Sequence, residues 1–465
     1  MSGPIVVGMD SFDVVVVGGG PSGEVAAGRL ADAGLEVALV EADLVGGECS
    51  FYACMPSKAL LRPQEVLREL RRIPGAAEAV TGELDVQAVL DRRDEIVHDL
   101  DDSSMLPWLE DRGIKLFRGH GVLAGEKRVR VADDELEARR AVILSPGSYA
   151  SLPPIEGLEE AGPWTNREAT TAKAVPDRIL ILGGGVVGTE LSQAYQSLGA
   201  EVTLIEGERH VLPTEEVFAC EQVSDALTAL GVDIRTGRKA TKVANTGDTI
   251  RVELDDGSSV EGGQLVAALG RRPHTGELGL DTVGLEPGEY VEVDENMQVP
   301  GHDWLYANGD VNGRALYTHM GKYQARLACE HILGNPSAAE QGADGRQSPR
   351  VVFTDPQVAA VGHTEKTARE AGLDVHVLEV STSGNAGGSY YGRNAPGTSR
   401  LLVDKERDVI VGATITGAEV ADFIHAATIA VVGEVPIARL RHAVPAFPTR
   451  SEIWLNLLEQ AETGR

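Results

Sequence analysis

Two cysteines and a lysine lie close together in the segment Gly46-Gly-Glu-Cys-Ser-Phe-Tyr-Ala-Cys-Met-Pro-Ser-Lys58. Cys49 and Cys54 are five positions apart, which along an undistorted helix is a rise of about 7.5 Å. A disulfide usually has about 4.4–6.8 Å between its Cα atoms, so a Cys49–Cys54 bridge would strain or break a helix. Strain makes a disulfide easier to reduce, and a helix beginning near Cys49 favours a thiolate. The spacing is typical of a redox-active pair; two unpaired thiols that fill space are the alternative.

The residues before these cysteines have the order of a dinucleotide-binding unit. An apolar β-branched run, Phe12 to Val17, predicts a buried parallel strand, and Gly18-Gly-Gly-Pro-Ser-Gly23 follows at once. A helix over 24–33 and a strand over 36–40 are expected next, and Glu41 ends that strand. Strand, glycine turn, helix, strand and acid together predict dinucleotide binding.

Each glycine of this turn has its own task. Gly18 permits the tight turn, Gly20 lets the backbone approach a pyrophosphate, and Gly23 lets the helix pack on the strand. Glu41 can accept hydrogen bonds from the ribose of an adenosine.

The same pattern returns at Arg178-Ile-Leu-Ile-Leu-Gly-Gly-Gly-Val-Val-Gly-Thr-Glu190, with Gly183, Gly185 and Gly188 in the turn. A helix and a strand over 202–205 follow, and the strand ends in Glu206. Gly18 and Glu41 are 23 positions apart, as are Gly183 and Glu206. The repeat predicts a second dinucleotide site; a simple helix–strand turn is the alternative.

The remaining segments indicate how the domains close. Helices are expected over 59–115, and strands at 115–118, 129–131 and 141–144, the last leading to Ser148. Residues 262–272 are expected to close the second domain. The strand 305–310 ends in Asp310, which could bind a ribityl chain if the strand returns to the first domain; a plain turn is the alternative. Four further strands, followed by helices from 419 and 451, predict a C-terminal α+β domain.

Length and composition limit the number of domains, the possible partners and the location of the protein. The 465 residues predict about three domains, and 71 acidic against 42 basic side chains give a net charge of −29, which opposes binding to nucleic acid or an anionic membrane. Residues 1–11 lack the basic start of a signal peptide, and the apolar run after them is too short to span a bilayer, so a cytoplasmic protein is expected. Cys220 and Cys329 stand alone and are expected to be buried thiols. No metal-ligand cluster is predicted.

Together these residues resemble the pyridine nucleotide-disulfide oxidoreductases, the flavoenzyme family that includes dihydrolipoamide dehydrogenase, glutathione reductase and mercuric reductase. The resemblance covers nearly the whole chain and rests on the order and spacing of several motifs. They are Gly-Gly-x-Cys-x4-Cys-x-Pro-Ser-Lys, the two glycine turns, Ala268-Leu-Gly-Arg-Arg-Pro273, Tyr306-Ala-Asn-Gly-Asp-Val311, and Val352-Phe-Thr-Asp-Pro356 with Val361-Gly362.

The resemblance implies an α/β fold with two Rossmann-like domains, for FAD and for NAD, and a C-terminal α+β dimerisation domain. The expected segments are 1–150 (FAD-binding, first part), 151–272 (NAD(P)-binding), 273–345 (return to the FAD or central domain) and 346–465 (dimerisation). A homodimer is implied in which the C-terminal region completes the partner's active site.

The resemblance also implies roles for single residues. Cys54 faces the flavin as the charge-transfer thiol and Cys49 exchanges with substrate. Lys58 and Glu190 form an ion pair beside flavin and nicotinamide, with a surface salt bridge as the alternative. The expected cofactor contacts are Gly18, Gly20, Gly23, Glu41, Gly121, Ser148, Asp310 and His319 for FAD, and Gly183, Gly185, Gly188, Glu206 and Gly270 around the nicotinamide nucleotide.

Glu206 favours NADH over NADPH, because a carboxylate repels a 2′-phosphate and accepts a hydrogen bond from a 2′-hydroxyl. Arg209 and His210 are close enough in sequence to leave NADPH open.

One position departs from the family pattern. Disulfide reductases of the family carry His-Pro-Thr-x-x-Glu, in which the histidine is the acid/base and the glutamate orients it. This chain has Phe447-Pro-Thr-Arg-Ser-Glu452, and a phenyl ring carries no proton. His442, His425 and His319 are alternative proton donors.

The expected function is an FAD-dependent NADH oxidoreductase that passes electrons through Cys49–Cys54 to a disulfide or thiol. One alternative is a diaphorase that reduces a quinone, oxygen or a metal. A mercuric-type reductase also needs no histidine, but such enzymes usually carry a C-terminal cysteine pair, and none follows Leu457 here. A non-catalytic subunit of a larger complex is the third alternative, and the physiological substrate is left open.

Overall fold

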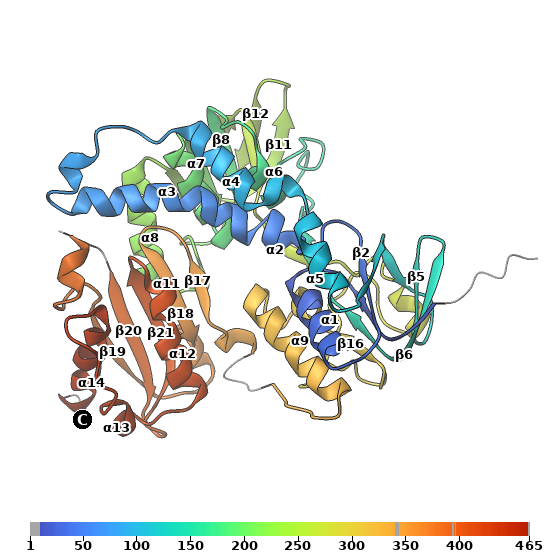
Figure 1. Cartoon of the computed structure of the whole chain (residues 1–465). Helices are drawn as coiled ribbons and strands as arrows, with labels where there is room; N and C mark the ends of the chain where they lie inside the picture. The colour runs from blue at the N-terminus through green and yellow to red at the C-terminus, as the bar shows by residue number, and fades with distance from the viewer. Residues whose placement is uncertain (1–9, 340–343, 393–394, 396, 464–465) are drawn as a thin grey trace, which may run out of the picture. The chain divides into compact units, whose positions relative to one another are not determined.

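The computed structural model of the chain (Figure 1) describes residues 10–339, 344–392, 395 and 397–463. These residues form two compact units, each built from three stretches of the chain. Unit 1 combines residues up to 55 with 94–149 and 271–345, and unit 2 combines 56–93, 150–270 and 346 onward. Unit 1 therefore joins the beginning of the chain to the return segment, whereas residues 56–93, expected within the segment 1–150, belong to unit 2.

Unit 1 is organised around a sheet whose described strands lie in the order β3-β2-β1-β6-β5-β4, with β16 also paired to β6. Strands β1, β2, β3, β6 and β16 pair in parallel, and β4 and β5 extend the sheet antiparallel. The strands are β1 Asp10–Val17, β2 Val37–Glu41, β3 Lys115–Arg118, β4 Gly121–Leu123, β5 Arg128–Val131, β6 Asp134–Leu144 and β16 Leu305–Ala307.

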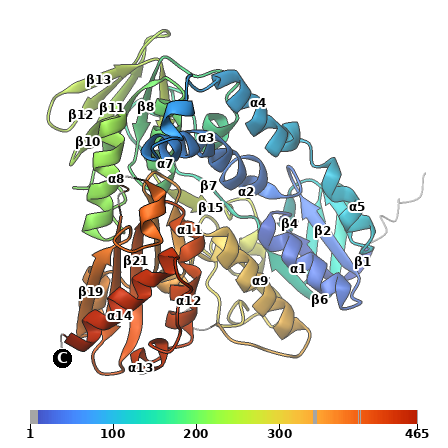
Figure 2. The same cartoon turned by 60° about the vertical axis from the view of Figure 1, so that its left-hand side comes forward.

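Both faces of this sheet are covered, because β1 alternates its valines between two cores. Val14 and Val16 pack with helices α1 (Pro21–Asp32) and α9 (Thr318–Ile332), while Val15 and Val17 pack with residues of β5 and β6 on the other face. Helices α1 and α9 lie side by side in both views (Figures 1 and 2). Unit 1 also contains α2 (Gly47–Phe51), α5 (Leu106–Glu110), β15 (Arg271–Pro273) and the 3-10 turn Gly309–Asn312.

The first half of unit 2 repeats the parallel motif. Its sheet has the order β10-β9-β8-β14, and helices α7 and α8 pack on a common core with Ile179, Ile181 and Leu204. An antiparallel sheet, β11-β12-β13, is attached. The strands are β8 Arg178–Leu182, β9 Glu201–Glu206, β10 Asp233–Thr236, β11 Ala240–Asn245, β12 Ile250–Leu254, β13 Ser259–Gly262 and β14 Gln264–Ala267; the helices are α3 Cys54–Arg72, α4 Val86–Ile96, α6 Asn166–Thr171, α7 Val186–Ser197 and α8 Val217–Leu230, and β7 is Ser148–Ala150.

The second half of unit 2 is an antiparallel sheet of order β17-β18-β21-β20-β19. Helices α11, α12 and α14 pack on one core with these strands (Figure 2). The elements are β17 Arg350–Val352, β18 Gln357–Gly362, α10 Glu365–Glu370, β19 Val375–Ser381, β20 Thr398–Asp404, β21 Val409–Gly417, α11 Val420–Phe423, α12 His425–Val432, α13 Ile437–Leu440 and α14 Ile453–Thr463. The expected α+β region is confirmed, but β18 and α10 were not predicted.

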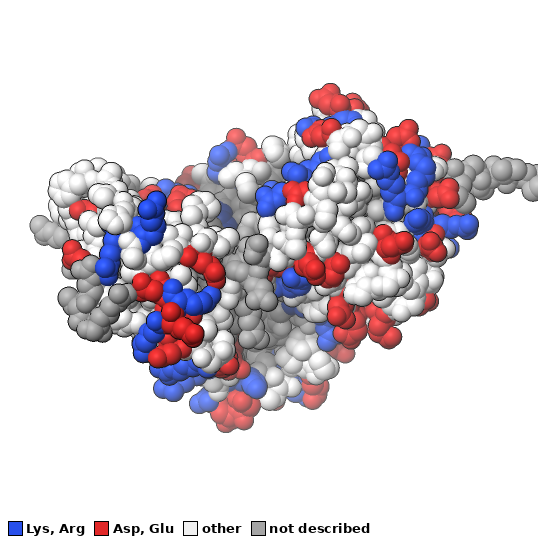
Figure 3. Space-filling view, turned by 90° about the horizontal axis from the view of Figure 1, so that it is seen from below, with Lys and Arg blue, Asp and Glu red and all other residues white. Residues whose placement is uncertain are grey.

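On the face of the molecule shown in Figure 3, acidic and basic side chains alternate in small groups. None of the described helices combines the length and the apolar character that crossing a membrane requires.

Candidate active site

The first glycine turn is packed too closely for any side chain at two of its positions. A Cβ on Gly18 would lie 2.1 Å from the carbonyl oxygen of Ser145, and a Cβ on Gly23 would lie 1.8 Å from that of Gly18. Gly18 also has φ +103°, a conformation that glycine adopts without strain. Gly20 is the N-cap of α1 and has no side-chain cap, so the N–H groups of the first helical turn are available to a pyrophosphate.

Glu41 is held against this turn by two backbone donors. Its carboxylate accepts hydrogen bonds from the N–H groups of Gly19 (2.5 Å) and Asp43 (2.7 Å). Burial raises the pKa of Glu41, and these N–H groups act against that rise.

The second turn repeats these contacts. A Cβ on Gly183 would lie 2.2 Å from the carbonyl oxygen of Ala268, and one on Gly188 would lie 1.8 Å from that of Gly183. Gly185 is the N-cap of α7 and has open space where a Cβ would stand. The Glu206 carboxylate accepts from the N–H groups of Gly184 (2.5 Å) and Glu208 (2.7 Å). The structure thus forms two equivalent dinucleotide turns.

The cysteine segment is packed directly on the first turn. The N–H of Gly46 donates to the carbonyl of Gly19 at 2.9 Å, and a Cβ on Gly47 would lie 2.6 Å from the Cα of Gly20. Glycines at 46 and 47, both with positive φ, permit this close approach. The contact fixes the start of α2, and with it Cys49, beside the first dinucleotide turn.

The two cysteines occupy separate helices. Cys49 is in α2, and Cys54 is the first residue of α3. A continuous helix through both is therefore absent, which removes the strain that a bridge would have imposed on it.

The thiols interact with each other and with α9. The Cys54 side chain and burial raise the pKa of the Cys49 thiol, while the Thr318 hydroxyl and the Lys322 ammonium act in the opposite direction. Thr318 Oγ1 lies 3.6 Å from Cys54 Sγ. The two sulfurs therefore lose their protons in separate steps. The sequence led us to expect that a helix N-terminus favours the Cys49 thiolate. That expectation did not include the Cys54 thiol, which raises the pKa of Cys49.

Cys220 and Cys329 are buried, as expected. Burial raises the pKa of each thiol to about 12, which leaves both in the unreactive protonated form at neutral pH.

Within unit 2, Lys58 and Glu190 form the expected ion pair. Lys58 Nζ lies 2.7 Å from Glu190 Oε2, and Glu190 Oε1 accepts the N–H of Phe353 at 2.9 Å. The ammonium also lies over the Phe353 ring, 4.8 Å from its centroid. The Glu190 side chain is 4% exposed and that of Lys58 is 33% exposed, so the carboxylate of the pair is buried while the ammonium is partly exposed. The contacts of Phe353 with Glu190 and Lys58 depend on tertiary packing, and the motif Val352-Phe-Thr-Asp-Pro356 does not predict them.

Asp310 does return to unit 1, in the turn after β16. Its carboxylate accepts a hydrogen bond from the Ser148 hydroxyl at 2.5 Å, and Arg271 Nε lies 3.9 Å away. Burial raises the pKa of Asp310, and Ser148 and Arg271 act against that rise. Ser148 and Asp310 were both expected to contact the cofactor, whereas the contacts of Arg271 with them were not expected.

Three further residues, Gly121, Gly270 and His319, were expected to contact a cofactor. A Cβ on Gly121 would meet the side chains of Val17 and Val40 at 2.9 and 3.0 Å. Gly270 has φ +108° and its carbonyl accepts the N–H of Ser151. His319 is exposed and stacks on Tyr317, with the ring centroids 5.5 Å apart.

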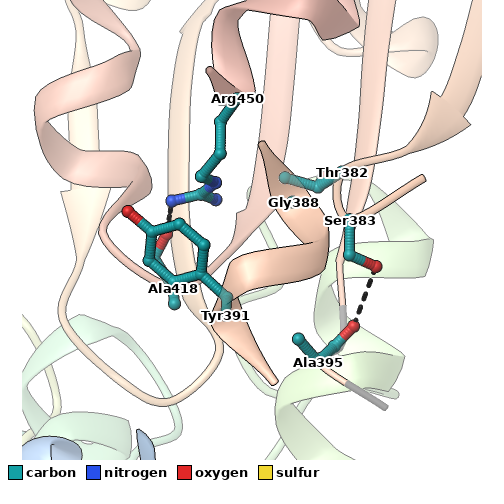
Figure 4. A pocket seen from close by; sticks show the side chains of 7 residues that line it. All are labelled: Thr382, Ser383, Gly388, Tyr391, Ala395, Ala418 and Arg450. Carbon is teal, nitrogen blue, oxygen red and sulfur yellow. Dashed lines mark hydrogen bonds between the residues drawn. The ribbon is translucent and has the colours of Figure 1, made fainter. Parts of the chain in front are cut away.

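The segment that replaces the family histidine is well anchored in unit 2. Arg450 donates to the carbonyl of Ala418 and lies over the Tyr391 ring, 4.5 Å from its centroid, at a small pocket (Figure 4). Phe447 is 77% exposed. Glu452 Oε2 is buried and has no hydrogen-bond partner among the described residues. The glutamate of the motif is thus present without the residue that it would orient.

Neither of the two alternative histidines of unit 2 forms a hydrogen bond with Glu452 in the described part of the chain. Both His442 and His425 are exposed.

Comparison with known proteins agrees with this arrangement. A family model described as "Pyridine nucleotide-disulphide oxidoreductase" matches residues 12–329, and the model of the dimerisation domain of that family matches residues 348–457. A dihydrolipoyl dehydrogenase of Thermus scotoductus is 33% identical, over 98% of this chain and 97% of its own length. A mercuric reductase of Lysinibacillus sphaericus is 28% identical, over 96% of this chain and 82% of its own length.

Solved structures share the fold. LpdA from Mycobacterium tuberculosis superposes with a TM-score of 0.85 at 24% identity, over 97% of this chain and 100% of that chain. The copper complex of the flavoprotein disulfide reductase RclA from Escherichia coli also gives 0.85, at 23% identity and the same coverage.

Proposed function

Because the chain belongs to the pyridine nucleotide-disulphide oxidoreductase family, we propose that Cys49 and Cys54 form its redox-active centre and receive electrons from NADH through FAD. Family membership makes the chain an FAD-dependent NAD(P)H oxidoreductase that acts on sulfur groups. The observation that carries the finer proposal is the packing of Gly46 and Gly47 on the first glycine turn, which holds the start of the cysteine segment beside that turn.

The residues of the first site fit FAD. The N-terminus of α1 has no side-chain cap, and a Cβ built on Gly20 would lie 3.8 Å from the Cα of Gly47, an ordinary contact distance. Glu41 is oriented for the adenosine ribose and the half-buried Asp310 carboxylate for the ribityl hydroxyls. FAD, when bound, accepts two electrons from a nicotinamide and supplies them to a disulfide. The resemblance to the family assigns the stabilisation of reduced flavin to Lys58, whose ammonium is fixed by Glu190 within unit 2.

NADH is the preferred nucleotide in this proposal. The backbone donors of Gly184 and Glu208 fix the Glu206 carboxylate at the end of β9, so it cannot turn away from a 2′-phosphate without losing two hydrogen bonds. A ribose 2′-hydroxyl can donate to the same oxygens.

The chemical step on a disulfide substrate uses both cysteines. The Cys49 thiolate attacks one substrate sulfur, which forms a mixed disulfide and releases the first thiolate. The Cys54 thiolate then attacks the Cys49 sulfur, which restores the Cys49–Cys54 disulfide and releases the second thiolate. Each released thiolate takes a proton from solvent, because Phe447 supplies none.

The lack of an acid at 447 limits the substrate. A released aliphatic thiol has a pKa near 8.5 and is a poor leaving group without a proton, whereas a more acidic thiol departs as the anion. We therefore propose a disulfide with acidic thiol leaving groups as the substrate class. The second candidate, a soft metal ion or a quinone, rests on the same exposed phenylalanine, since neither reduction releases a thiolate.

A second copy of the chain is the proposed partner of the C-terminal sheet. Ile429, Val444 and Phe447 are 58%, 79% and 77% exposed, and all three lie in the segment matched by the dimerisation-domain model. Burying such side chains against an equivalent surface is favourable, by roughly 1.5–3 kcal/mol for each fully buried residue.

The test is the oxidation of NADH by the flavin-loaded protein with four acceptors: an aromatic disulfide, lipoamide, a benzoquinone and Hg²⁺. Fast reduction of the aromatic disulfide that is lost in Cys49→Ser supports the proposal. Quinone reduction that survives Cys49→Ser, with slow turnover of both disulfides, would instead establish a diaphorase. Cys220→Ser is the matched control, since that thiol is buried in the core of unit 2.

A further inference from the structure

Four polar residues around Arg271 join the cysteine-bearing helix to the proposed flavin site. Arg271 Nη2 forms an ion pair with Glu48, which directly precedes Cys49 in α2. The same guanidinium donates to the Ser148 hydroxyl at 2.7 Å and to the Ser148 carbonyl at 2.6 Å. The Ser148 hydroxyl in turn donates to Asp310. All four residues belong to unit 1.

Arg271 is placed between two carboxylates that repel each other. Glu48 and Arg271 each have side chains 22% exposed, and that of Asp310 is 26% exposed. The charge of Glu48 raises the pKa of Asp310, and that of Arg271 lowers it. Without the guanidinium, Asp310 would face an uncompensated negative charge in a largely desolvated site.

The packing of Gly46 and Gly47 fixes where α2 begins, and the local structure leaves the direction of the helix to contacts such as this one. Helix α2 has only five residues, and its N-cap and first residue are glycines with positive φ, so little within the helix fixes its direction. β15, which begins at Arg271, pairs with β7, which begins at Ser148. The arginine therefore extends from a paired strand to the short helix.

We propose that Arg271 is a positioning residue that ties α2 to the flavin-binding carboxylate Asp310, by pairing with Glu48 and holding Ser148. The inference rests on the proposed function, in which Asp310 binds the ribityl chain and Cys49 belongs to the redox centre. It predicts that removing Arg271 weakens flavin binding chiefly because Glu48 keeps its charge.

The experiment measures FAD release from the purified holoenzyme after dilution, followed by the recovery of free flavin fluorescence. Arg271→Met is expected to release FAD 10- to 100-fold faster, on the order of what the loss of one partner from a desolvated charge pair produces. Glu48→Gln in the Arg271→Met background is expected to return the rate to within about threefold of wild type. Arg271→Lys, which keeps the charge, is expected to lie between. Arg272→Met, at the exposed neighbouring arginine, is the matched control.

The rescue is the decisive comparison, because a purely structural role of Arg271 would not be restored by neutralising Glu48. Equal release rates in the single and double variants, or equal effects of Arg271→Met and Arg272→Met, would overturn the proposal. If Arg271→Met yields no flavoprotein, recovery of flavoprotein in the double variant supports the proposal and its failure there overturns it. A failure of the proposed function is seen separately, as full disulfide activity in Cys49→Ser, because FAD release does not depend on turnover.

Discussion

Replacing Phe447 by histidine should convert this chain toward efficient reduction of aliphatic disulfides. The substitution recreates His-Pro-Thr-x-x-Glu, and the glutamate of that motif is already present with a buried oxygen that lacks a partner among the described residues. A histidine at 447 could donate one ring N–H to Glu452, which fixes its tautomer, and protonate a leaving thiolate through the other nitrogen.

The expected size of the gain follows from the exposure of position 447 and from the usual contribution of a general acid. Phe447 is 77% exposed in the single chain, so its replacement should change the free energy of unfolding of the monomer by no more than about 0.5 kcal/mol. A positioned general acid contributes about 10²- to 10⁴-fold. We expect kcat/KM for lipoamide to rise at least about 100-fold, or about 2.7 kcal/mol of transition-state stabilisation, while turnover of an aromatic disulfide stays within about threefold.

The assay is NADH oxidation with each disulfide in wild type, Phe447→His, Phe447→Leu and Phe447→His with Glu452→Gln. The gain should be confined to histidine, decline above the pKa of its ring, and fall when Glu452 is neutralised. An equal gain in Phe447→Leu would show that steric relief, not proton transfer, limits wild type. No gain in Phe447→His, with flavin content and dimer intact, would refute the reasoning that position 447 governs the substrate class.

Three further predictions concern single carboxylates. Glu206→Ala should raise kcat/KM for NADPH by about tenfold and lower that for NADH, measured as the ratio of the two; an unchanged ratio would exclude Glu206 from nucleotide choice. Glu190→Gln should weaken the anchoring of Lys58 and slow flavin reduction by NADH in stopped flow by about tenfold or more, whereas equal rates would make the pair purely structural. Burial raises the pKa of Glu24 to about 7 against 4.5 in the unfolded chain, so its protonation stabilises the fold below about pH 4.5, and that stabilisation is lost as pH rises to 7. Glu24→Gln should therefore stabilise the protein by about 3 kcal/mol at pH 8 and by little at pH 4.5, and equal gains in urea unfolding at both values would contradict the assignment.

The local chemistry of the site could be predicted from the sequence wherever one short segment defines it. Gly18 and Gly183 stand where a side chain would collide with backbone, and the acids 23 positions on end the next parallel strand, so both turns follow from local rules. Lys58 and Glu190 are 132 positions apart, and their pairing came from the family resemblance.

What the sequence did not predict depends on tertiary contacts or on weak local signals. Nothing in a linear pattern joins Arg271 to Glu48, or places the Thr318 hydroxyl beside Cys54, because both pairs meet only after strands and helices have packed. β18 was missed because Gln-Val-Ala-Ala-Val-Gly is too short and too rich in alanine to show strand preference, although it is fully buried. Helix α10 did have a signal, the capping box that begins at Thr364.

The two dinucleotide turns also show why equivalent sites acquire different roles. Their glycines, helix N-caps and glutamates make the same kinds of contact in both turns. None of these features therefore decides which turn binds the flavin. The difference lies in what packs on each turn: Gly46 and Gly47 bring the cysteine segment onto the first, whereas Leu212 donates its N–H to Gly184 on the second. A group that must exchange electrons with a protein disulfide has to remain beside it, while a nucleotide that carries reducing equivalents must bind and leave. In the proposed function, the packing of Gly46 on Gly19 and of Gly47 on Gly20 therefore assigns the first turn to the flavin, a choice that the repeated motif alone leaves undetermined.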